Sequence, residues 1–159
     1  MGKASRQQAF DREFRGHIER LTPKLVSSLR AITGKKPPAE VKLLCFEVQS
    51  SWDTFPVSAF AMSDESPDEV YFKPPFSGRV LKSAGPLVPR GAIDQDGYEA
   101  AGVDTFERGA RLLCEGFGKC WDSAGGKAFP IPAYIRHHDR SPHYDLRSKR
   151  WVMESAIWS

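Results

Sequence analysis

The sequence predicts a single α+β domain with a mostly antiparallel sheet and two principal helices packed on it. Three observations support this fold class: two long segments with helical spacing of apolar residues, two short apolar runs joined by a turn-like segment, and a C-terminal region of β-like sequence. The chain has 159 residues, of which 40% are hydrophobic and 27% are charged. These values are typical of one globular domain, which we expect to span residues 1–159.

The first helix is predicted over residues 5–32, where apolar side chains recur every three or four positions. Pro23 interrupts this pattern. Because Thr22 can act as an N-cap and proline is favoured at the first helical position, either two consecutive helices or one kinked helix fits the segment. Gly34 is a typical C-terminal stop.

The second helix is predicted over residues 104–122. Asp104 is followed three positions later by Glu107, a spacing typical of a capping box. The stripe that we expect to be buried consists of Phe106, Ala110, Leu113, Cys114, Phe117 and Trp121. Three glycines lie inside the segment, and each weakens a helix by about 1 kcal/mol relative to alanine. We therefore expect the helix to pack closely against the sheet at Gly109, Gly116 and Gly118.

A β-hairpin is predicted from two apolar runs, residues 40–49 and 55–62. Both runs are apolar on both faces, which indicates strands near the centre of a sheet. The segment between them is turn-like and places Trp52 near the hairpin tip. An acidic loop, "SDESPDE" at residues 63–69, leads to a short third strand over residues 70–72.

The remaining segments are less regular. Residues 73–103 contain four prolines and five glycines, so we expect a long ordered loop with a short strand at residues 79–82. The run "AFPIPAYI" at residues 128–135 has two prolines, which is typical of an edge strand or an extended segment. A last strand is expected within residues 144–153.

Charge is unevenly distributed along the chain, although its net value is only +3. Residues 1–36 carry nine basic and three acidic residues, whereas residues 37–72 carry one basic and seven acidic residues. The acidic second quarter is either a solvated face or a docking surface for a basic partner.

The cysteines and the absence of targeting signals indicate a cytoplasmic protein. An odd number of cysteines, Cys45, Cys114 and Cys120, argues against a disulfide framework, so buried thiols are expected. The N-terminal residues are polar rather than signal-like, and no apolar run is long enough to span a membrane. We also find no complete motif for a nucleotide, calcium or other cofactor, and we expect none.

Three of the four histidines gather in "RHHDRSPHYD", residues 136–145. Imidazole binds metals and transfers protons, so one alternative function is a small metal-assisted hydrolase that uses His137, His138 and His143. Neighbouring residues on an extended segment point to opposite sides, which favours a polar surface turn with Pro142 at its corner.

A second alternative is a nucleic-acid-associated module. In the C-terminal tail, basic side chains are interleaved with Tyr134, Tyr144 and Trp151, a combination that can contact phosphates and bases. Acidic residues dilute this stretch and the net charge is low, so nucleic acid is an unlikely partner.

The order of elements, from an amphipathic helix through a hairpin and an acidic loop to a second helix and a β tail, resembles small bacterial α+β immunity proteins that neutralise polymorphic toxins. The likeness is of architecture and surface charge and covers residues 10–72. It implies a non-catalytic protein that binds one partner tightly, often through acidic loops facing a basic nuclease.

We therefore interpret the chain as a non-enzymatic, cytoplasmic protein-binding domain, and the resemblance implies the toxin-neutralising type. The expected partner is a basic protein, and the oligomeric state is left open. Tryptophan is a frequent interface anchor and carboxylates steer a basic partner. The predicted partner-binding residues are Trp52, Asp53, Asp64, Glu65, Asp68 and Glu69.

Overall fold

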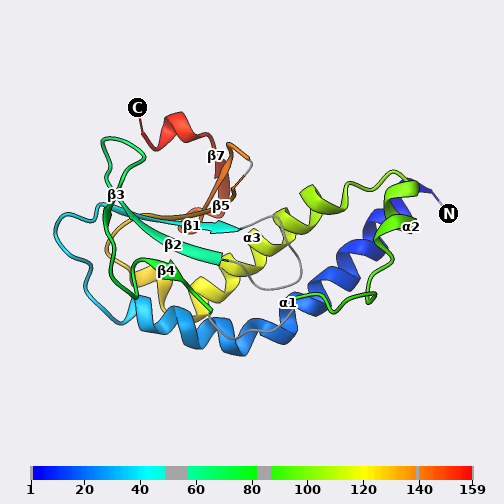
Figure 1. The fold of residues 1–159 in the computed structure, drawn as a ribbon, viewed down its shortest axis with the longest axis horizontal. Helices are drawn as coiled ribbons and strands as arrows, with labels where there is room; N and C mark the ends of the chain where they lie inside the picture. Colours follow the sequence, from blue (N-terminus) through cyan, green and yellow to red (C-terminus); the bar gives the residue numbers. More distant parts are fainter. Residues whose placement is uncertain (1, 49–56, 82–86, 139, 159) are drawn as a thin grey trace.

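A computed structural model describes residues 2–48, 57–81, 87–138 and 140–158 (Figure 1). Two main helices pack together against a sheet whose described strands number seven, which confirms the predicted α+β class. The strands are β1 (Leu43–Val48), β2 (Val57–Met62), β3 (Glu69–Tyr71), β4 (Gly78–Arg79), β5 (Ala133–His137), β6 (His143–Asp145) and β7 (Arg150–Val152). Their order is β3-β2-β1-β5-β6-β7, with β4 also paired to β2.

The predicted hairpin forms the antiparallel pair β1–β2, with Leu43 opposite Met62 and Val48 opposite Val57. β1 has neighbours on both sides, as its two apolar faces predicted. It pairs in parallel with β5, whereas the other described strand pairs are antiparallel. The sheet is therefore mixed but mostly antiparallel.

The first helix, α1, spans Lys3–Thr33 and continues through Pro23. Of the two alternatives, the single helix is the one that forms, and Figure 1 shows that its ribbon changes direction along its length. Such bending is the usual effect of a proline inside a helix, because the ring displaces the preceding turn and removes one hydrogen bond. Gly34 caps the helix, donating its backbone N–H to the carbonyl of Arg30 at 3.0 Å.

The second long helix, α3, spans Thr105–Ser123 and packs along α1. Its start is confirmed, because the Asp104 side chain accepts a hydrogen bond from the Glu107 N–H at 3.1 Å. The expected buried stripe is partly wrong. Phe106 is 48% exposed, whereas Leu112 and Cys120 are buried, because the helix contacts α1 on one side and the sheet on another.

Two glycines explain how α3 approaches its neighbours. A Cβ on Gly118 would lie 3.0 Å from the Tyr144 ring of β6, which agrees with the predicted close approach to the sheet. A Cβ on Gly116 would lie 2.9 Å from Cγ2 of Ile18, so this glycine instead admits α1.

The main core lies between the helices and one face of the sheet. Phe46 of β1 is its centre, with ring centroids 4.8 Å from Phe117 and 5.6 Å from Trp121. A smaller cluster on the opposite face contains Leu43, Cys45 and Met62. The C-terminal segment, which includes the short 3-10 helix η2 (Glu154–Ala156), covers part of that second face through Ile157 and Trp158.

One helix was missed. Residues 73–103, predicted as a loop with a strand, contain α2 (Gln95–Ala100) as well as the two-residue strand β4. Tyr98 of α2 packs on Phe10 of α1 at 5.4 Å and donates a hydrogen bond to Glu13 at 2.9 Å. A helix of six residues with one buried side chain gives no periodic signal, so its existence depends on contact with α1.

The predicted edge position of residues 128–135 is also wrong. β5 lies inside the sheet, between β1 and β6. Both prolines precede the strand, and Pro132 contributes its carbonyl, which accepts a hydrogen bond from the Leu44 N–H at 3.0 Å. A proline lacks only the N–H, so it is tolerated where the sheet requires an acceptor.

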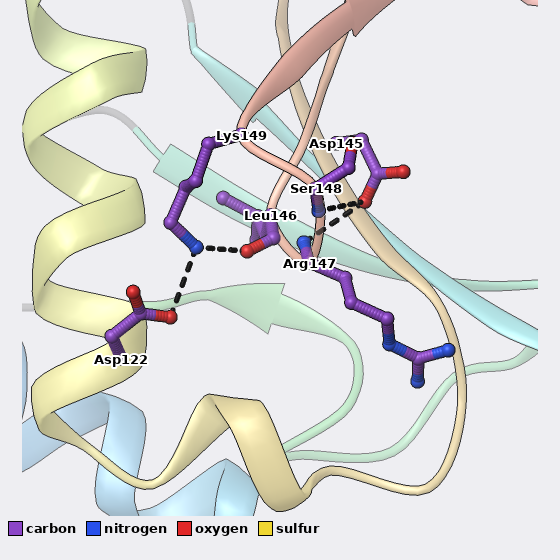
Figure 2. Close-up of polar contacts among 6 residues, drawn as sticks. All are labelled: Asp122, Asp145, Leu146, Arg147, Ser148 and Lys149. Carbon is purple, nitrogen blue, oxygen red and sulfur yellow. Dashed lines mark hydrogen bonds and ion pairs between the residues drawn. The ribbon is translucent and has the colours of Figure 1, made fainter.

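The expected last strand is in fact the hairpin β6–β7. The Asp145 carboxylate accepts hydrogen bonds from the N–H groups of Arg147, at 2.9 Å, and Ser148, at 3.4 Å, within the turn (Figure 2). Lys149 has a positive φ of 61° and donates to Asp122 of α3 at 2.9 Å and to the Leu146 carbonyl. The turn is thus tied to α3.

None of the described helices has the length and apolarity that a membrane span requires.

Candidate functional site

The predicted acidic loop forms an ordered turn between β2 and β3, which we call the acidic turn (residues 63–69). The Ser63 N–H donates to the Asp68 carbonyl at 3.0 Å and closes it. Inside, the Ser63 hydroxyl accepts from the Glu65 N–H at 3.1 Å, and the Ser66 hydroxyl donates to the Asp68 carboxylate at 2.5 Å. The turn therefore holds its own conformation before any partner arrives.

Three of the four carboxylates predicted in the acidic turn face solvent. Asp64, Glu65 and Asp68 are exposed, and within the described ranges no lysine or arginine forms an ion pair with them. Glu69 differs, because it is half-buried in β3 and accepts a hydrogen bond from the Ser77 hydroxyl at 2.7 Å. Glu69 thus links β3 to the segment before β4, a supporting position rather than a free one.

The C-terminal segment contacts the acidic turn through Trp158. The indole Nε1 of Trp158 donates to the Ser63 carbonyl at 2.7 Å. Its ring packs edge-on against His143, with centroids 5.8 Å apart. Figure 1 shows the chain end beside the loop that leads to β3. The turn is therefore anchored to the sheet at a second place.

Phe72, predicted to end the third strand, is exposed at the end of β3 away from the acidic turn. Phe72 directly follows β3 and is 70% exposed, more than any other large hydrophobic residue among those described. The two residues before it, Val70 and Tyr71, both pack on the main core, and Tyr71 lies 6.4 Å from Phe76. Lys73 and two prolines follow, so the strand ends and leaves Phe72 at the sheet edge. No sequence signal distinguished it from a buried strand residue.

The other two predicted residues, Trp52 and Asp53, lie outside the described residues. Their part in the surface stays a prediction. The acidic turn and Phe72 together define the candidate site, which we call the acidic edge: Asp64, Glu65, Asp68 and Phe72.

The three histidines of the tail do not share one environment, because His143 is buried. His143 is 1% exposed, and its Nδ1 lies 2.9 Å from the Ser141 carbonyl oxygen, so that nitrogen carries the hydrogen. Burial lowers the pKa of His143, and the charge of Arg136 acts in the same direction. This histidine is therefore a neutral core residue near neutral pH.

The other two histidines lie together, contrary to the expectation that they point apart. Their rings are 5.0 Å apart because β5 ends at His137, so His138 no longer follows the strand alternation. His138 Nδ1 is 3.3 Å from the Val48 carbonyl oxygen. Among the described residues, no three His, Cys, Asp or Glu side chains are placed to hold a metal ion. The described part of the tail thus lacks the ligand set that the hydrolase alternative needs.

The basic tail residues mostly contact acidic groups of this same chain. Arg136 lies 3.5 Å from Glu47, Arg140 lies 3.7 Å from Glu107, and Lys149 bonds Asp122. A nucleic-acid site needs basic side chains that are available to phosphates. Arg147 and Arg150 are exposed, and the described ion pairs do not include them, so the nucleic-acid alternative stays a prediction.

The three cysteines are buried free thiols, as predicted. Burial raises the pKa of the Cys45 thiol to about 12 and also raises the pKa values of Cys114 and Cys120. Because the thiolate is the nucleophile, these three thiols are unreactive near neutral pH.

The members of the acidic edge lie at the two ends of β3. Phe72 is four residues beyond Asp68, about 14 Å along an extended chain. That separation fits within one protein interface, which buries about 800 Å² on each partner. No family model, curated protein or solved structure matches this chain.

Proposed function

We propose that this chain is a non-catalytic protein-binding domain that captures a basic partner through the acidic edge. The observation that carries the proposal is the 70% exposure of Phe72 at the end of the strand that follows three exposed carboxylates. An exposed aromatic ring and several exposed carboxylates at the two ends of one edge strand can serve as an interface anchor and its charged rim.

The order of the acidic turn supports this function energetically. Binding loses free energy when loops must be immobilised, at about 0.5–1.5 kcal/mol for each ordered side chain. The hydrogen bonds around Ser63 and Asp68, and the Trp158 indole, hold the backbone of the turn before binding. The carboxylates can therefore steer a basic partner without a large ordering cost.

The compartment and the partner class follow from the same proposal. Three buried free thiols suit a reducing compartment, so we propose that binding occurs in the cytoplasm. A basic toxin domain is the partner class that the resemblance to immunity proteins gives, and the acidic edge provides charge of the opposite sign.

The test compares the wild-type chain with two variants as bait in a lysate of its own host, followed by reconstitution with the purified partner. Phe72→Ser removes the anchor, and we expect a loss of affinity of about 2 kcal/mol or more. Asp64→Lys with Asp68→Lys should mainly slow association and reverse its salt dependence.

Matched controls lie on α1, α2 and α3, outside the acidic edge. Phe106→Ser removes a second exposed aromatic ring on α3, and Glu19→Lys with Asp96→Lys reverses two exposed charges on α1 and α2. These variants should bind like the wild type. Equal loss in the controls, or unchanged binding of the Phe72 and Asp64/Asp68 variants, would contradict the acidic edge as the interface.

A further inference from the structure

A cavity of about 110 Å³ lies on α3, at the end of the sheet opposite to the acidic edge. Its apolar wall consists of Ala110 and Cys114 of α3, Pro142 in the segment before β6, and Trp151 of β7. Cys114 is fully buried, and burial raises the pKa of its thiol, so the floor carries no charge. The cavity combines an uncharged floor with an opening to solvent.

Charged side chains stand around the opening. The Arg111 guanidinium carbon lies 5.1 Å from the centre of the Trp151 ring, a cation–π contact that holds it over the apolar wall. Arg140 comes from the other side, and its Nη2 lies 3.7 Å from Oε2 of Glu107. The two arginines and this glutamate together contribute one net positive charge, and the His137 imidazole also lines the cavity.

We propose that this cavity binds a small monocarboxylate with an apolar body, its carboxylate between Arg111 and Arg140 and its body against Trp151. Small-molecule sites are typically apolar concavities with a few polar groups that fix the ligand's orientation. Arginine suits a carboxylate because its planar fork matches the two oxygens.

Arg140 already pairs with a carboxylate of this chain, that of Glu107. The pair is 3.7 Å long, and the two side chains are 52% and 49% exposed, so it contributes little stability. A ligand carboxylate that also reaches Arg111 gains a second cation and can displace Glu107. A dianion such as phosphate gains less. Glu107 repels its second charge, and the apolar wall offers no hydrogen-bond donors to its remaining oxygens.

The size of the cavity limits the apolar body. A dry apolar cavity of about 150 Å³ accommodates benzene. The volume here, about 110 Å³ with an open mouth, fits one six-membered ring or a short branched chain whose carboxylate stays at the rim. Benzoate and 4-methylpentanoate are suitable probes, and benzamide is the neutral counterpart of benzoate.

The experiment is a titration of the full chain followed by NMR, reading the Trp151 indole and the Arg111 and Arg140 side chains. Both carboxylates should shift these signals, and benzoate should bind about tenfold more tightly than benzamide, because its charged carboxylate accepts stronger hydrogen bonds from the arginines. Arg140→Gln should weaken benzoate about tenfold and leave benzamide unchanged. Lys119→Gln, a cation of the same helix outside this cavity, should have no effect.

A gain of binding provides the sharpest readout, because damage to the fold cannot produce it. Glu107→Gln removes the competing carboxylate and should tighten benzoate binding several-fold, whereas Glu115→Gln on the same helix should not. Ala110→Leu fills the cavity and should abolish binding of benzoate and benzamide alike. Equal affinity for benzoate and benzamide, shifts centred elsewhere, no shift with either carboxylate, or weaker binding by Glu107→Gln would overturn the proposal.

Discussion

Arg108 of α3 donates two hydrogen bonds to the carboxylate of Asp11 in α1, from Nε to Oδ1 at 2.8 Å and from Nη2 to Oδ2 at 2.6 Å. Few of the described polar residues are buried, and Asp11 is one of them, with 7% of its surface exposed. The Arg108 side chain keeps 33% of its surface exposed. This two-point contact fixes the N-terminal half of α1 against the first turn of α3.

Removing either partner leaves the other unpaired. We expect Asp11→Ala and Arg108→Ala each to lower the free energy of unfolding by about 2 kcal/mol, less than for a fully buried pair because Arg108 is partly hydrated. The double variant should lose less than the sum of the two. Urea denaturation of the four proteins measures this coupling, and strictly additive losses would show that the pair contributes nothing.

Two glycines in helices should respond to alanine in opposite ways. Gly16 of α1 has open space where a Cβ would lie, so Gly16→Ala should raise the free energy of unfolding by about 1 kcal/mol through helix propensity. Gly116→Ala would bring a methyl group to 2.9 Å from Ile18, whose branched side chain cannot easily move away. We expect this variant to be destabilised by about 1 kcal/mol or more. Thermal unfolding of both proteins is the measurement, and stabilisation by Gly116→Ala would refute the close packing.

Acid should destabilise the protein through His143. Burial lowers the pKa of this histidine below its ordinary value of 6.5. The unfolded chain therefore binds a proton at a higher pH than the folded one, so stability is lost as the pH falls from 6.5 through the lowered pKa. Urea denaturation across this range, together with NMR titration of the imidazole, measures the effect.

The pKa of His17 is also lowered, by burial and by Arg20, so it contributes in the same direction. The variant His17→Gln isolates the remaining dependence, because His17 lies on α1 away from the Tyr134–His143–Trp158 contacts. If stability in this variant stayed constant through the acid range, His143 would not be the buried neutral group described here.

Lys149 separates a backbone effect from a side-chain effect in the β6–β7 turn (Figure 2). Its φ of 61° favours glycine, whereas its ammonium group bonds Asp122 at 2.9 Å. Lys149→Ala loses the contact and keeps the strained backbone, but Lys149→Gly loses the contact and relieves the strain. We expect the alanine variant to be less stable than the glycine variant by about 1 kcal/mol in chemical denaturation. The reverse order would mean that the backbone at this position is not strained.

Local signals in the sequence determined the elements whose causes lie within a few residues. The helical spacing and the Asp104 cap predicted α3 to within one residue at each end, and the two apolar runs predicted the antiparallel pair β1–β2. The acidic turn was equally predictable, because its serines and acidic residues bond backbone groups two to five positions away.

Only the tertiary structure decided the features that depend on distant contacts. β5 became an interior strand because its parallel partner β1 lies some ninety positions earlier, and no nearby residue encodes that pairing. The exposure of Phe72 and Phe106 is likewise a tertiary property, because it depends on which surfaces the other elements cover. The cavity on α3 likewise needs Arg111, Arg140 and Trp151 together, from three separate elements. Periodicity and capping act over one or two turns of chain, whereas strand order and exposure are set by which surfaces meet after the chain has folded.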